Sequence, residues 1–138
     1  MGELGDRVRR YFEACSDGDA GVIASHFTEG AVIFDTNVPP VRGAEAIGNW
    51  WIKVRQRWNG ARWYVDSMVE QPDAVAIEWT MTGTRDGTPF AVRGSEHYRF
   101  AGGLIDRINQ YWTFDPDHLD TGLLEFPYPD RYEPAGPA

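Results

Sequence analysis

The sequence predicts an α+β fold in which three N-terminal helices pack on one strongly curved antiparallel sheet. Two observations support this class. Apolar residues recur at helical spacing in three stretches of the first 58 residues. Between residues 62 and 114, four segments rich in aromatic and β-branched residues follow one another at hairpin spacing. Helices followed by a run of strands are typical of an α+β layer architecture.

The helices are predicted over residues 4–16, from Asp19 to about Phe27, and over 43–58. The first has an apolar face made of Leu4, Val8, Tyr11, Phe12 and Cys15. The second is short, and Asp19 is its expected N-cap. The third has an apolar stripe made of Ile47, Trp50, Trp51 and Val54. Gly60 is expected to end this third helix.

The strands are predicted over residues 31–35, 62–70, 74–84, 90–100 and 104–114. A loop with two prolines, residues 36–42, separates the first strand from the third helix. Turns are expected at Gln71-Pro72-Asp73, Asp86-Gly87 and Gly102-Gly103. We therefore interpret residues 1–116 as one domain. Residues 117–138 are rich in proline but keep several aromatic and leucine side chains, so we expect an ordered strap over the domain or a partner, not a helix.

Composition narrows the function classes. A formal net charge of −8 argues against nucleic acid and anionic membrane as partners. Cys15 is the single cysteine, which excludes an intrachain disulfide and favours a reducing compartment. The N-terminus lacks an apolar signal region, and no stretch has the length of a membrane span. We expect a cytoplasmic protein.

Glu96 occupies an unusual place in its predicted strand. Strand alternation puts it on the same face as Tyr98 and Phe100, which is the inward face. A carboxyl group there is costly unless it is protonated or paired. The opposite face is of mixed polarity, with Glu78, Thr80, Thr82, Ser95 and His97, and is expected to point outward.

Tyr11, Asp35 and Glu96 are the candidate catalytic residues. A phenol and two carboxyl groups that converge in an apolar pocket can abstract one proton and stabilise one oxyanion. Structural interpretations stay open for each residue. Tyr11 could be a core tyrosine with its hydroxyl at the surface, Asp35 a turn or cap residue, and Glu96 the partner of an arginine.

A metal site is not expected. His118 lies in the acidic stretch DPDHLD, which lacks the glycine and the ligand register of a calcium loop. No pair of histidines has zinc-ligand spacing. We expect neither a metal nor a cofactor.

Five segments resemble the nuclear-transport-factor-2-like superfamily: RRYFEACSDGD, AVIFD, VRGAEAI, AIEWTMTGT and GSEHYRF. The resemblance extends nearly to Pro116 and is strongest to ketosteroid isomerase and the SnoaL-like polyketide cyclases. It implies a cone-shaped sheet wrapped around the helices, of the cystatin-like roll type. By position, Tyr11 resembles the isomerase's helix tyrosine, Asp35 its proton-transferring base, and Glu96 its protonated strand aspartate.

The chain also departs from these relatives. Glu96 is one methylene longer than the aspartate, Thr36 replaces a proline, and Trp51 stands where the isomerase has a second tyrosine. The aspartate that epoxide hydrolases of this fold carry in the last strand is missing, because that stretch reads Asn109-Gln110.

The resemblance implies a cofactor-independent enzyme that transfers a proton next to a carbonyl on a small apolar substrate, by isomerisation or by ring closure. A dehydratase, or a non-catalytic binding or interaction module, is the alternative. The expected substrate contacts are Phe27, Trp51, Trp79, Met81, Tyr98, Ile108, Gln110 and Trp112. By analogy with the superfamily we expect a homodimer that pairs through the outward sheet face.

Overall fold

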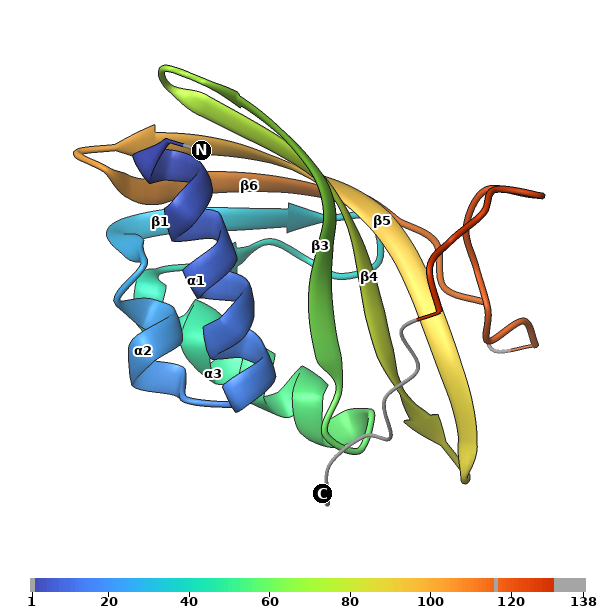
Figure 1. The fold of residues 1–138 in the computed structure, drawn as a ribbon. Coiled ribbons are helices and arrows are strands. Elements are labelled where there is room, and N and C mark those ends of the chain that lie inside the picture. The colour runs from blue at the N-terminus through green and yellow to red at the C-terminus, as the bar shows by residue number, and fades with distance from the viewer. Residues whose placement is uncertain (1, 116, 131–138) are drawn as a thin grey trace.

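The computed structural model describes residues 2–115 and 117–130. Its helices are α1 (Glu3–Asp17), α2 (Ala20–Ala24) and α3 (Ala44–Arg57). Its strands are β1 (Phe27–Asp35), β2 (Val41–Arg42), β3 (Arg62–Gln71), β4 (Ala74–Arg85), β5 (Thr88–Ala101) and β6 (Leu104–Trp112). The helices lie together on the concave side of a curled sheet, which stays open (Figure 1). The predicted α+β cone is confirmed.

The six strands form one sheet in the order β2-β1-β6-β5-β4-β3. Neighbouring strands are antiparallel except β1 and β6, which run parallel. The sheet is therefore mixed, where the sequence analysis expected a purely antiparallel one. A parallel pair needs a long connection, and here the whole of α3 and four strands separate the two partners.

Element bounds differ from the predicted ones by a residue or two in several places, and three differences bear on the site. The second helix ends at Ala24, and β1 already begins at Phe27, where the chain pairs with Ile105 of β6. The predicted loop 36–42 contains the two-residue strand β2, which pairs with β1. The last strand ends at Trp112, two residues early. Pairing with distant strands decides these bounds, and local composition does not reveal it.

The core lies between the helices and the concave face of the sheet. On α1, the predicted apolar face is buried except for the half-buried Leu4, and Gly18 ends the helix with a positive φ of 76°. Asp19 caps α2 as predicted, since its side chain accepts a hydrogen bond from the backbone of Val22. Much of the core is aromatic: Tyr11 makes edge-on contacts with Phe12, Phe27, Trp51 and Tyr98.

The outward face of the sheet is less exposed than the alternation pattern indicates. Thr80 and Thr82 were expected to point to solvent, but both are buried. Thr80 donates a hydrogen bond of 2.5 Å to Asp66 on the neighbouring strand β3. His97, further along the same face, is exposed as predicted.

Residues 117–130, hereafter the strap, lie beside β5, on the side of the sheet away from the helices (Figure 1). The backbone of Ala91 in β5 donates to Leu119 and accepts from Thr121. Arg93 donates to Asp120 and lies 4.1 Å from the ring centroid of Tyr128. Leu123, Leu124 and Phe126 of the strap remain exposed.

Candidate active site

Three candidate polar residues lie side by side on three neighbouring strands. Gln110 in β6 is the register partner of Asp35 in β1 and of Glu96 in β5. Residues in register on adjacent strands direct their side chains to the same face, here the concave one. The sheet therefore places an amide between two carboxyl groups.

Glu96 is buried, with 2% of its surface exposed. Its two carboxyl oxygens lie 3.3 and 3.2 Å from the hydroxyl of Tyr98. Burial raises the pKa of Glu96 to about 8; the Tyr98 hydrogen bond lowers this pKa and the negative charge of Asp35 raises it. No arginine pairs with Glu96 within the described part of the chain, so the ion-pair interpretation is wrong. At neutral pH Glu96 is mainly a carboxylic acid, able to donate a hydrogen bond.

Asp35 is half-buried at the end of β1 and is held by three donors. The Gln110 amide nitrogen lies 2.5 Å and the Trp112 indole nitrogen 3.0 Å from its Oδ2 atom. The backbone N–H of Asn37 donates to Oδ1 over 2.7 Å, which forms a small turn. The turn interpretation is thus correct for one oxygen, while the other faces donors from β6.

The Tyr11 hydroxyl is buried, which rules out the surface interpretation. It has no oxygen or nitrogen partner among the residues that the structure describes. Burial raises the pKa of Tyr11 well above its ordinary value of 10, and the charges of Cys15 and Glu96 add to the shift. Tyr11 therefore keeps its proton, and its hydroxyl, which has the Cys15 thiol as a neighbour, can donate to a bound oxygen.

Of these groups, Tyr11, Glu96 and Gln110 line a two-part cavity. Asp35 is not among the lining residues; it lies behind the wall and is hydrogen-bonded to Gln110 and Trp112, which are. The inner part, the chamber, has a volume of about 10 Å³, enough for one water-sized group. Its walls are Tyr11, Phe12, Cys15, Trp51, Trp63, Trp79, Glu96 and Gln110. The outer part, the cleft, measures about 730 Å³ and shares Trp51, Trp63, Trp79 and Gln110 with the chamber. A single oxygen atom of a bound molecule fits the chamber, while its apolar body fits the cleft.

The predicted substrate contacts divide into two groups. Trp51, Trp79 and Gln110 line both chamber and cleft, and Met81 and Trp112 line the cleft. Tyr98 lines neither chamber nor cleft, and it contacts the site through its hydrogen bond to Glu96. Phe27 packs edge-on against Tyr11 with a centroid distance of 5.1 Å, and Ile108 is fully buried. Phe27 and Ile108 support the wall from behind and do not form part of it.

Several residues of the cleft were not predicted, most clearly Arg57 and Arg85 at the ends of α3 and β4. The Arg85 guanidinium carbon lies 5.9 Å from the ring centroids of both Trp58 and Phe114. A charged residue beside a turn gives no local signal of a cavity. Its position next to Asp86-Gly87 at the open end of the cone was the available clue.

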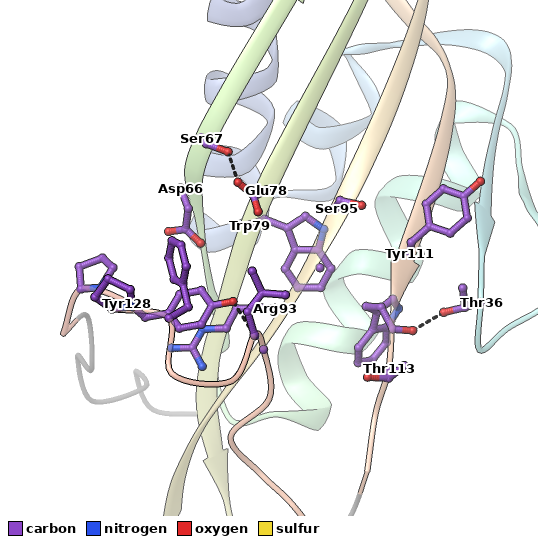
Figure 2. A pocket seen from close by; sticks show the side chains of 17 residues that line it. Thr36, Asp66, Ser67, Glu78, Trp79, Arg93, Ser95, Tyr111, Thr113 and Tyr128 are labelled. Atoms are coloured by element: carbon purple, nitrogen blue, oxygen red, sulfur yellow. Dashed lines mark hydrogen bonds between the residues drawn. The ribbon is translucent and has the colours of Figure 1, made fainter.

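A separate hollow of about 760 Å³ lies between the convex face of the sheet and the strap (Figure 2). Figure 2 shows Glu78 and Ser95 of the sheet on one side and Tyr128 of the strap on the other. Ser67 donates to Glu78 over 2.7 Å. Tyr11, Glu96 and Gln110 are not among its lining residues. The convergent polar groups thus belong to the concave side, and we place the candidate site there.

Two further findings concern the described residues. They contain no cluster of His, Cys, Asp and Glu arranged to hold a metal ion. No helix among them is long and apolar enough to cross a membrane.

The arrangement is that of the nuclear-transport-factor-2-like class, a helix-filled α+β cone with a polar cavity. Residues 8–108 match the model of the SnoaL-like domain, and the chain belongs to this family. No match was found among curated proteins.

Solved structures share the fold at low sequence identity. A protein of unknown function with a cystatin-like fold from Methylobium petroleophilum PM1 has a TM-score of 0.73 and 22% identity, covering 91% of this chain and 82% of its own. A protein with a ketosteroid isomerase-like fold from Catenulispora acidiphila, in complex with trimethylamine, has a TM-score of 0.72 and 20% identity, covering 82% and 88%. A putative SnoaL-like polyketide cyclase from Jannaschia sp. CCS1 has a TM-score of 0.70 and 16% identity, covering 80% and 85%.

Proposed function

We propose that the protein is a cofactor-independent enzyme that transfers a proton next to the carbonyl group of a small, largely apolar molecule. The observation that carries the proposal is the chamber, which has room for one oxygen atom between the Tyr11 hydroxyl and the protonated carboxyl of Glu96. Asp35 lies in register across Gln110 from Glu96. Two donors facing one oxygen position, from α1 and β5, and a base on a nearby strand are what enolisation requires.

In the proposed reaction the substrate carbonyl oxygen enters the chamber. Asp35 takes a proton from the neighbouring carbon, the C–H electron pair becomes the C=C bond of an enolate, and the carbonyl electrons move to oxygen. Tyr11 and Glu96 donate hydrogen bonds to that oxygen, and the surrounding apolar walls strengthen these bonds by excluding water. If a second C=C bond adjoins that carbon, the enolate extends over it and Asp35 returns the proton to the far carbon of that bond. Alternatively, the enolate carbon attacks a second carbonyl and closes a ring, and the alkoxide formed there takes the proton from Asp35.

Isomerisation and ring closure share the first step, so the first step is what an experiment should measure. The bicyclic ketone 1-tetralone is a suitable probe, because its exchangeable α-hydrogens report enolisation by NMR in D₂O. We expect the protein to accelerate exchange above the buffer rate. Asp35→Asn should abolish most of this acceleration, by about 10²- to 10⁴-fold for loss of a general base.

Asp106→Asn is the matched control, since Asp106 is an exposed acid at the far end of β6 that accepts a hydrogen bond from Thr28. The Asp106→Asn variant should accelerate the α-hydrogen exchange of 1-tetralone as much as the wild-type protein does. Binding of 1-tetralone without any accelerated exchange would favour a non-catalytic binding protein. If the Asp35→Asn variant accelerates exchange as much as the wild-type protein, Asp35 is not the base.

A further inference from the structure

The walls of the chamber and cleft contain five buried polar atoms without a hydrogen-bond partner among the described residues. They are the Tyr11 hydroxyl, the indole nitrogens of Trp51 and Trp79, Nη1 of Arg85, and Oε1 of Gln110. The two indoles and the guanidinium can only donate, and the phenol donates or accepts. Only Gln110 presents a pure acceptor. A buried acceptor with no donor is unfavourable, so a ligand that supplies one is selected over a ligand that does not.

The orientation of the Gln110 amide follows from its neighbour. The carboxylate of Asp35 can only accept hydrogen bonds, so the amide atom 2.5 Å from it must be the NH₂ group. The carbonyl oxygen is then the other end of the amide. Gln110 is 4% exposed, and it lines both chamber and cleft. Its free oxygen therefore lies where the body of a ligand meets the reacting carbonyl.

Neighbouring groups do not satisfy this oxygen. Glu96, its register partner on β5, has the Tyr98 hydroxyl within hydrogen-bond distance of both of its own oxygens. Trp112 on the same strand donates its indole N–H to Asp35. Oε1 has no hydrogen-bond partner among the described residues, and the proposed reaction directs the proton of neutral Glu96 to the substrate oxygen.

We propose that Gln110 selects substrates which carry a hydroxyl or N–H group near the reacting carbonyl, and that Oε1 accepts a hydrogen bond from that group. The inference rests on the proposed function, because it takes the chamber as the carbonyl site. The amide of Gln110 then makes two hydrogen bonds. Its NH₂ group donates to the base Asp35, and its oxygen accepts from the hydroxyl or N–H group of the substrate. The substrate class narrows from apolar ketones to hydroxy- or amino-substituted ketones.

The test compares the binding of 1-tetralone with that of its monohydroxy positional isomers, by isothermal titration calorimetry. The wild-type protein should bind at least one hydroxylated isomer about 10- to 100-fold more tightly than 1-tetralone, as expected when a buried acceptor gains its donor. The 8-hydroxy isomer is an internal control, because its hydroxyl donates to its own carbonyl. Absence of any preference in the wild-type protein would overturn the proposal without need of a variant.

Two variants separate the acceptor role from support of Asp35. Gln110→Met removes both ends of the amide and should erase the preference while 1-tetralone still binds, which also shows that the variant is folded. Trp112→Phe removes another donor to the same Asp35 oxygen but leaves Oε1 in place, so the preference should persist. A preference that survives Gln110→Met, or that disappears in Trp112→Phe, would contradict the assignment.

Failure of this inference is distinguishable from failure of the proposed function. If 1-tetralone exchanges its α-hydrogens but no hydroxylated isomer binds better, Gln110 has no selective role and the enzyme proposal stands. If the hydroxylated isomer binds more tightly but no exchange occurs, the protein is a non-catalytic binding protein in which Gln110 accepts a hydrogen bond from the ligand.

Discussion

The Tyr98 hydroxyl lies 3.2 Å from Oε2 of Glu96, two residues earlier on the same strand. Both side chains are buried, and the hydrogen bond favours the charged form of Glu96 against the much larger effect of burial. The two residues together set the pH at which the carboxyl group stops being a donor.

Tyr98→Phe is therefore expected to raise the pKa of Glu96 further above about 8, because the variant removes a donor to the carboxylate and keeps the burial. The measurement is a carbon-13 NMR titration of glutamate carboxyl groups, with Glu96→Gln used to assign the resonance. Tyr111→Phe is a suitable control on the exposed face. A Glu96 pKa near its ordinary value of 4.5 in the wild-type protein would contradict the donor role.

Stability should fall as pH rises between about 4.5 and about 8. In this interval the folded protein keeps the Glu96 proton that the unfolded chain releases, so the free energy of unfolding decreases, by up to about 1.4 kcal/mol per pH unit. Below pH 4.5 the contribution is complete, and above pH 8 it is lost. Urea unfolding of wild type and Glu96→Gln at several pH values would test this. The variant should show a flatter profile in this interval, and parallel profiles would refute the expectation.

The catalytic roles predict an order of effects on α-proton exchange. Tyr11→Phe should slow exchange by about 10²- to 10³-fold, as loss of one oxyanion donor does. Glu96→Gln should cost less, because an amide still donates. It should also lack the decline in rate above about pH 8 that is expected of the wild type when Glu96 loses its proton. Asp35→Asn should be the most severe of the three. A silent Asp35→Asn together with an inactive Glu96→Gln would identify Glu96 as the base.

Gly94 should not tolerate a side chain. A Cβ atom at this position would lie 2.5 Å from the backbone oxygen of Tyr111 and 2.7 Å from the ring of Trp79. Backbone cannot move aside cheaply, so Gly94→Ala should destabilise the protein by about 1–3 kcal/mol. Gly30→Ala is the control, because nothing lies within 4 Å of its Cβ position. Thermal or urea unfolding would compare them, and equal stabilities would show that the sheet adapts.

Assembly is expected to be dimeric. The convex face and strap expose Tyr111, Leu124 and Phe126, with 54%, 95% and 50% of their surfaces accessible. Pairing of two copies through this side would cover those apolar groups. Sedimentation at micromolar concentration should give a species of twice 15.6 kDa. A single species of 15.6 kDa would refute the dimer.

Local patterns were sufficient for the elements that form locally. The apolar face of α1 and the cap at Asp19 follow from spacing and residue type, and the hairpins of β3 to β6 follow from their turns. The inward position of Glu96 follows from strand alternation alone. These features depend on residues close together in the sequence, and sequence analysis found them.

The pairing of strands that are far apart in the sequence could not be predicted from local patterns. The contact between Gln110 and Asp35 joins residues 75 positions apart, and it exists because β1 lies parallel to β6. Sequence alone left the register of the last strand uncertain by one residue, and a one-residue shift would move Gln110 to the opposite face. The burial of Thr80 has the same kind of origin, since Asp66 comes from another strand.

The bonds between Ala91 and the strap matter for solubility as well. Beyond the end of β6, the backbone of β5 would present unpaired N–H and C=O groups, which are a template for another chain to add as a strand. Residues 119–121 occupy those groups from within the same molecule. A chain shortened before Leu119 would thus expose an open strand edge and should aggregate, even if its cavity remained intact.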